Sequence, residues 1–130
     1  MSGTVIPLIT KRDFNFDNGT ATVTVVKAVP VSQYTEGVLL VRVHSSGIAS
    51  SSTLEVRART TAPTAEEPSV DFVNDTSMAS VSLDSDAAAG DLERAALTDD
   101  FGAFLQIQVE GTQDGGNCNA VISADLVLKD

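Results

Sequence analysis

The segment DFNFDNGTATVTVVKAV, Asp13–Val29, alternates apolar and polar side chains on both sides of an Asn-Gly pair. Phe14 and Phe16 alternate with polar residues before the pair, and Thr alternates with Ala and Val after it. A period of two is typical of a β-strand with one buried face, and Asn-Gly favours the positive φ angles of a two-residue turn. The segment therefore predicts two antiparallel strands joined as a hairpin at Asn18-Gly19.

The same segment also has a metal-binding interpretation, because Asp13, Asn15 and Asp17 are spaced like calcium ligands. In a calcium loop of that kind the glycine of the sharp turn stands one position before Gly19, and a bidentate Glu stands where this chain has Val25. Both departures favour the hairpin, so we expect this segment to be scaffold.

The same alternation recurs along the chain and marks further strands. The candidate strands are Thr4–Thr10, Val38–Ser45, Thr53–Thr60, Val70–Val73, Ala79–Leu83, Phe104–Glu110 and Ala120–Lys129. Their inward residues are predicted to be Leu39, Val41, Val43, Leu54, Val56, Ala58, Leu105, Ile107, Val109, Ile122, Ala124, Leu126 and Leu128. We expect Val38–Ser45 and Thr53–Thr60 to pair as a second hairpin across a serine-rich loop.

Only the stretch Ser85–Leu97 has a helical composition, and Gly90 interrupts it. We expect at most one or two helical turns there, over Asp91–Leu97. Elsewhere the composition favours strands, because the chain is rich in Val and Thr, has only 5% aromatic residues and has no Trp. The sequence thus predicts an all-β fold, an antiparallel two-sheet β-sandwich of jelly-roll type with about eight strands. We expect a single domain over residues 1–130, with residues 1–12 as a candidate extended N-terminal arm.

The charge distribution bears on the class of partner. The net charge is −10, and between Thr61 and Leu128 there are thirteen acidic residues and only one basic residue, Arg94. Such a surface repels phosphate groups, so we expect no nucleic-acid partner and no anionic membrane surface. No apolar run is long enough to span a bilayer, and the opening residues do not have the order of a secretory signal. We therefore expect synthesis in a cytoplasm.

The inventory of reactive side chains argues against catalysis. The chain has one His, His44, and one Cys, Cys118, so it cannot form an internal disulfide. The nearest charges to Cys118 in sequence are Asp114 and Asp125, which do not favour a thiolate. No nucleophile elbow, phosphate loop or dinucleotide fingerprint is present. We expect no enzyme activity, no catalytic, metal or cofactor-binding residues, and no cofactor.

One alternative stays open at this point. A calcium ion at a loop of the sandwich would find carboxylates at the following positions: Asp84, Asp86, Asp99 and Asp100.

A basic stripe is the more distinctive feature of the sequence. If the second hairpin forms, its outer face gathers the residues Arg42, His44, Arg57 and Arg59, together with Glu55. Such a stripe could contact the acid-rich second half of another copy, as a heterologous subunit interface. The alternative is a solvated face with a few weak ion pairs.

Three segments carry a resemblance to a known class of protein. They are GVLLVRVHSSG (Gly37–Gly47), FLQIQVEGTQDGG (Phe104–Gly116) and ISADLVLKD (Ile122–Asp130), with an acidic stretch between the first two. Together they resemble small β-sandwich structural proteins of tailed bacteriophages, which decorate or reinforce the capsid or sit at the tail. The resemblance implies a virion protein that contacts itself and a major capsid or other virion protein.

The leading functional hypothesis is therefore a non-enzymatic capsid decoration or cement protein that stabilises a phage head by subunit contacts. The alternative is a carbohydrate-binding or adhesion module, although sugar sites favour aromatic platforms and Tyr34 is the lone tyrosine. A small hydrolase or metal-dependent enzyme is the third class. The segment Thr4–Thr10, with Pro7 suited to a sheet edge, could reach a neighbour by strand addition.

Overall fold

The computed structural model describes residues 3–17, 19–31, 33–61, 72–97 and 104–129, and eight β-strands lie in these ranges. No helix occurs among the described residues, and accordingly none is long and apolar enough to cross a membrane. The strands are β1 (Gly3–Asn15), β2 (Thr20–Pro30), β3 (Glu36–Ile48), β4 (Thr53–Thr61), β5 (Phe72–Leu83), β6 (Leu92–Ala96), β7 (Phe104–Thr112) and β8 (Cys118–Lys129).

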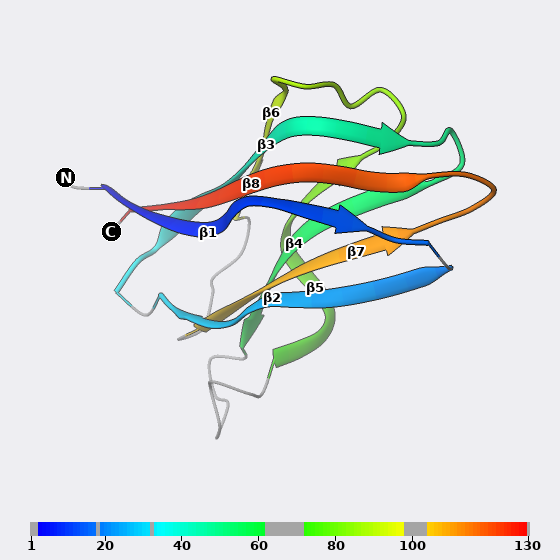
Figure 1. Ribbon diagram of the computed structural model, residues 1–130. Coiled ribbons are helices and arrows are strands. Elements are labelled where there is room, and N and C mark those ends of the chain that lie inside the picture. Colours follow the sequence, from blue (N-terminus) through cyan, green and yellow to red (C-terminus); the bar gives the residue numbers. More distant parts are fainter. Residues whose placement is uncertain (1–2, 18, 32, 62–71, 98–103, 130) are drawn as a thin grey trace.

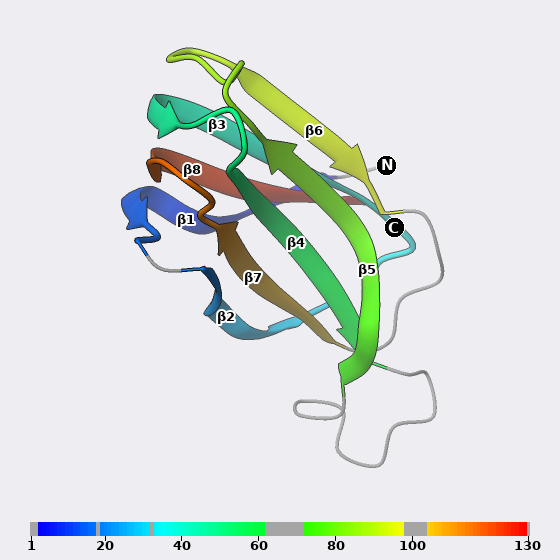
Figure 2. The ribbon, with the colours of Figure 1, turned by 90° about the vertical axis from the view of Figure 1, so that its right-hand side faces the viewer.

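The strands form two four-stranded antiparallel sheets, ordered β1-β8-β3-β6 and β2-β7-β4-β5. Figures 1 and 2 show the sheets as two facing layers. Only β4 and β5 are consecutive strands that pair with each other; every other connection passes from one sheet to the other. This strand order is that of an eight-stranded jelly roll, so the predicted fold class is confirmed.

The core lies between the two layers and is built from the side chains that alternation assigned to the interior. Every predicted inward residue is buried, from Leu39, Val41 and Val43 on β3 to Ile122, Ala124, Leu126 and Leu128 on β8. A fully buried Val, Leu or Ile contributes about 1.5–3 kcal/mol relative to an exposed one. Burial of these rows therefore holds the two layers together.

The predicted hairpin at Asn18-Gly19 is wrong in its pairing. The strands β1 and β2 both exist, but β1 pairs with β8 and β2 pairs with β7, so they belong to different sheets. Gly19 has a positive φ of 62°, as the turn prediction required, whereas Asn18 lies outside the described residues. The alternation specifies strands and the glycine specifies a reversal, but neither specifies the partner strand.

Phe16 lies at the start of the β1–β2 connection and contacts both sheets. It follows β1, is 7% exposed, and its backbone N–H donates to the Cys118 carbonyl at 2.9 Å. Its ring lies against Gly111 of β7, in the opposite sheet. The chain therefore leaves the first sheet with an aromatic side chain packed across the end of the core.

The second predicted hairpin is also wrong. The strand β3 pairs with β8 and β6, and β4 pairs with β7 and β5, so the serine-rich loop also joins the two sheets. Within this loop the Ser52 N–H donates to the Ala49 carbonyl at 3.0 Å, and Ser52 is fully buried. Its hydroxyl accepts from the Asp114 N–H at 3.0 Å, which fastens the loop to the β7–β8 connection.

The helical turn expected over Asp91–Leu97 is wrong, because these residues form strand β6. β6 pairs antiparallel with β3 from Val38 to Arg42. A helix of one or two turns is not stable alone in water, whereas the open edge of β3 offers backbone partners. The tertiary environment therefore overrides the local helical preference.

Two strand boundaries differ from the sequence prediction. The candidates Val70–Val73 and Ala79–Leu83 belong, where described, to the single strand β5, and residues 70 and 71 lie outside the described ranges. The residues of the candidate N-terminal arm form the first part of β1 from Gly3 onward, paired with β8 and interrupted by irregularities around Pro7, Ile9 and Arg12. Irregularities of this kind on an edge strand discourage pairing with another chain.

Replacing Gly111 by alanine should destabilise the protein by about 1–3 kcal/mol, because the new methyl group would overlap the Phe16 ring. Chemical denaturation monitored by circular dichroism measures the change. The matched control is Gly3→Ala, whose methyl group would lie at an ordinary 3.6 Å from the Leu128 carbonyl oxygen. Equal stabilities for the two variants would contradict the packing of Phe16 across the end of the core.

Candidate functional site: the outer faces of the two sheets

The four residues of the predicted basic stripe lie on two different faces. Arg42 and His44 belong to β3, and Arg57 and Arg59 belong to β4, in opposite sheets. The stripe required β3 and β4 to pair, so it does not form as one surface. A role of either pair in contacting a neighbouring subunit stays a prediction.

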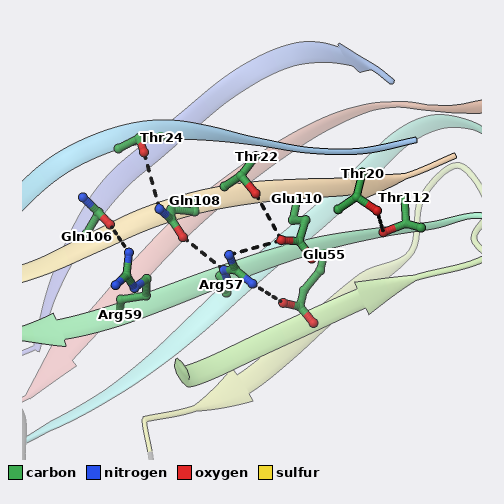
Figure 3. A network of polar contacts seen from close by, with 10 residues as sticks. All are labelled: Thr20, Thr22, Thr24, Glu55, Arg57, Arg59, Gln106, Gln108, Glu110 and Thr112. Carbon is green, nitrogen blue, oxygen red and sulfur yellow. Dashed lines mark hydrogen bonds and ion pairs between the residues drawn. The ribbon is translucent and has the colours of Figure 1, made fainter. Parts of the chain in front are cut away.

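Arg57 is the centre of a polar network on the outer face of the sheet β2-β7-β4-β5 (Figure 3). Its Nη1 lies 3.5 Å from a Glu55 carboxylate oxygen, its Nη2 lies 3.3 Å from a Glu110 oxygen, and its Nε donates to Gln108 Oε1 at 3.1 Å. The Arg57 side chain is only 23% exposed. Glu55 and Glu110 stand directly opposite each other on β4 and β7. Like charges in that position repel, so the guanidinium is required to hold them together.

Hydrogen bonds extend this network over three strands. Glu110 accepts from the Thr22 hydroxyl at 3.1 Å, and Gln108 donates to the Thr24 hydroxyl at 3.5 Å, so β2 is joined to β7. Arg59 donates to Gln106 Oε1 at 3.0 Å, which joins β4 to β7 again. In the described part of the chain, no buried side-chain nitrogen or oxygen lacks a hydrogen-bond partner. This face is therefore a polar layer whose groups are directed at one another.

The outer face of the sheet β1-β8-β3-β6 has a different character. Cross-strand pairing places Val5, Val127, Val38 and Ala96 in one row across all four strands. Val5 is 62% exposed, and Leu92, which lies on the same face opposite Arg42, is 53% exposed. We call Val5, Val127, Val38 and Ala96 the apolar row.

A shallow hollow of about 270 Å³ lies at the β3–β6 end of the apolar row. Its lining consists of Glu36, Gly37, Val38, Ala96, Leu97, Val127 and Lys129. Sequence reasoning missed this surface, because each valine is an unremarkable strand residue until the register of four strands is known. The alternation of Asp125, Val127 and Lys129 on the outward positions of β8 was the one local signal for it.

The two reactive side chains, His44 and Cys118, each contact a residue of another strand. His44 Nε2 is 3.0 Å from the Ser123 hydroxyl, a cross-strand contact on the outer face of β3 and β8. Cys118 is 1% exposed, and its thiol donates to the Thr53 carbonyl at 3.2 Å. Burial raises the pKa of the Cys118 thiol, although a backbone hydrogen bond from Thr112 opposes the shift. A buried thiol with a raised pKa is a poor nucleophile.

Of the carboxylates considered for calcium, that of Asp84 is used by the loop between β5 and β6, as is that of Asp91, which was not among the candidates. An Asp84 oxygen accepts from the Asp86 N–H at 2.9 Å, and an Asp91 oxygen accepts from the Ala88 N–H at 2.9 Å. Asp99 and Asp100 lie outside the described residues. Within the described ranges, no group of three or more His, Cys, Asp or Glu side chains has an arrangement that could hold a metal ion.

Comparison with known proteins finds likeness in structure and none in sequence. No protein-family model matches the chain, and neither does any curated protein. A chain in the structure of infectious bursal disease virus, Gx strain, superposes with a TM-score of 0.52 at 12% identity, covering 98% of this chain and 31% of that chain. Chains from the VP2 subviral particle and the Gt strain of the same virus give a TM-score of 0.48, at 13% and 12% identity, with 98% of this chain and 32% of each covered.

The chain therefore spans about a third of the length of these viral chains. At 12% identity, the similarity to the Gx-strain chain establishes a shared fold.

Replacing Arg57 by methionine should lower the free energy of unfolding by about 1–2 kcal/mol, because Glu55 and Glu110 then face each other uncompensated. Arg57→Met should cost less free energy of unfolding when Glu110→Gln is already present, because one of the two facing charges is then gone. A double-mutant cycle by urea denaturation measures this coupling between Arg57 and Glu110. Arg42→Met is the matched control, since Arg42 is exposed and forms no ion pair among the described residues. Equal losses for Arg57→Met and Arg42→Met would contradict the bridging role.

Proposed function

We propose that this chain is a non-enzymatic structural protein of a virion, and specifically a capsid decoration or cement protein of a tailed bacteriophage. The observation that carries the proposal is the jelly-roll strand order of this chain, together with its similarity in fold to a chain in the structure of infectious bursal disease virus. The bacteriophage assignment and the decorating role are supported by the resemblance of Gly37–Gly47, Phe104–Gly116 and Ile122–Asp130 to phage sandwich proteins.

The energetics of the fold suit such a role. The interior is a continuous apolar layer, and Arg57, Gln108 and Glu110 tie three strands together on one outer surface. A network of this kind resists deformation of the sheet, because breaking one contact leaves partly buried polar groups unpaired. A rigid unit is the property that a reinforcing subunit of a shell needs.

The two outer faces differ in chemistry, which supports a protein with one attached side and one exposed side. In the polar network each described buried nitrogen or oxygen has a hydrogen-bond partner, whereas the apolar row leaves Val5 exposed. The net charge of −10 disfavours contact with packaged nucleic acid. This favours a position on the outside of the shell, with a major capsid protein or other virion protein and further copies of the chain as partners.

A carbohydrate-binding module is the alternative function, and one observation favours it. The polar network presents Thr, Gln, Arg and Glu side chains on a sheet face, which are groups that hydrogen-bond sugars. Those groups are engaged with one another, and sugar sites usually add an aromatic platform. Phe14 and Phe16 are buried, and the Tyr34 hydroxyl donates to Thr4. The virion role is therefore the better supported of the two.

The proposed function predicts that the chain accompanies viral particles from the source that encodes it. Nuclease-treated particles should be banded on a density gradient and each fraction assayed for this chain by peptide mass spectrometry. We expect the chain in the particle band, and its release by mild denaturant should leave intact shells with a lower disruption temperature. Adding the purified chain back should restore that temperature.

Two results would contradict this proposal in different ways. If the chain stays in the low-mass fractions and binds glycans on an array, the virion role fails. If its release dissolves the shell, the chain is a shell subunit and the decorating role fails.

A further inference from the structure

The apolar row on the sheet β1-β8-β3-β6 has a charge pattern that matches itself. On the outward positions of β8, Asp125 and Lys129 stand two residues to either side of Val127. Cross-strand pairing sets Glu36 beside Lys129 and sets Arg94 beside Leu40, which is the neighbour of Asp125. One side of the row is thus formed by Lys129 and Glu36, and the other by Asp125, Leu40 and Arg94.

No ion pair joins any of these four charged side chains to another described residue. Asp125 is half-buried and Lys129 is exposed, both at the margin of a row whose member Val5 is 62% exposed. Protein interfaces commonly have an apolar centre and a polar rim, and the charges of the rim complement those of the partner.

We propose that two copies of this chain pack through the apolar row, face to face, about a two-fold axis that runs along the row and passes Val127. This rotation reverses the strand direction of the partner's β1-β8-β3-β6 sheet, and it places β8 over the partner's β8. Each Asp125 then stands opposite the partner's Lys129, and each Glu36 comes diagonally to the partner's Arg94. Valine meets valine on the axis itself. Two sheets packed in this way lie about 10 Å apart with nearly aligned strands.

A second copy is the occupant that this pattern fits. An isologous contact requires one patch to complement itself, and the order Asp125, Val127, Lys129 does so when read in opposite directions on two facing strands. Rotation about an axis that runs parallel to the strands, between β8 and β3, also brings valines together, because it sets Val127 against the partner's Val38. It places Asp125 against the partner's Leu40. Lys129 would then face the partner's Glu36. The two arrangements therefore respond differently to the same charge reversals.

The test is the mass of the purified full-length chain in solution, measured by sedimentation equilibrium over a range of concentrations and at two salt concentrations. The wild type should reach twice its chain mass of 13.5 kDa. Asp125→Lys alone and Lys129→Asp alone should each weaken the dimer about tenfold or more, because like charges then oppose each other twice per dimer. The double variant with both substitutions should regain most of the affinity, and salt should weaken the wild-type dimer.

Asp86→Lys is the matched control, since it makes the same charge change on the exposed β5–β6 loop and should leave the dimer unchanged. Thermal unfolding of each variant verifies that the monomer is folded. A wild type that stays monomeric up to about 0.1 mM (a concentration far above a micromolar Kd) would overturn the proposal. The proposal would also fail if the double variant dimerised no more tightly than the single variants. It would fail as well if Lys129→Asp weakened the dimer and Asp125→Lys did not.

The proposed function includes contacts between copies of the chain, and this inference rests on it by naming the surface through which two free copies pair. A monomeric chain that still binds particles would overturn the dimer and leave the virion role standing. A dimer that never appears with particles would do the opposite.

Discussion

The register of β8 between β1 and β3 is the constraint on which the rest of the structure depends. Along its length β8 pairs with β1 on one side and β3 on the other, and Leu126 stands opposite both Ile6 and Leu39. This register sends Ile122, Ala124, Leu126 and Leu128 into the core. The same register sends Asp125 and Val127 outward. A slip of one residue would exchange the two sets, burying Asp125 and Lys129 in an apolar interior, so the core fixes the register strongly.

The sequence predicts the strands and their buried faces well, because side-chain alternation is a local property. Leu54, Val56 and Ala58 could be assigned to the core without knowing which strand lies beside them. Partner strands could not be assigned in the same way. Asn18-Gly19 and the serine-rich loop are local reversals, but a jelly roll uses them to cross between sheets, and only long-range packing such as that of Phe16 on Gly111 decides this. The strand β6 was missed because its residues prefer a helix until β3 offers an edge.

The candidate site was affected by the same limitation. Arg42 and Arg57 were placed on one face because β3 and β4 were assumed to pair, and the structure puts them on opposite sheets. The polar network around Arg57 depends on β7 lying between β2 and β4, and the apolar row depends on the register of four strands. No stretch of sequence contains either surface as a whole. The sequence does contain the order of the outward residues Asp125, Val127 and Lys129. This order indicates a surface with opposite charges on its two sides only once β8 is known to be a central strand.

The most direct test of this account is the measurement of cross-strand backbone contacts by nuclear Overhauser effects on the isotope-labelled protein. The jelly-roll order predicts contacts from the backbone protons around Leu126 to those of both Ile6 and Leu39, because β8 lies between β1 and β3. Contacts between the backbones of β3 and β4, for example from Val41 to Val56, would mean that the two strands form a hairpin. That result would contradict the jelly-roll order and, with it, both outer faces described above.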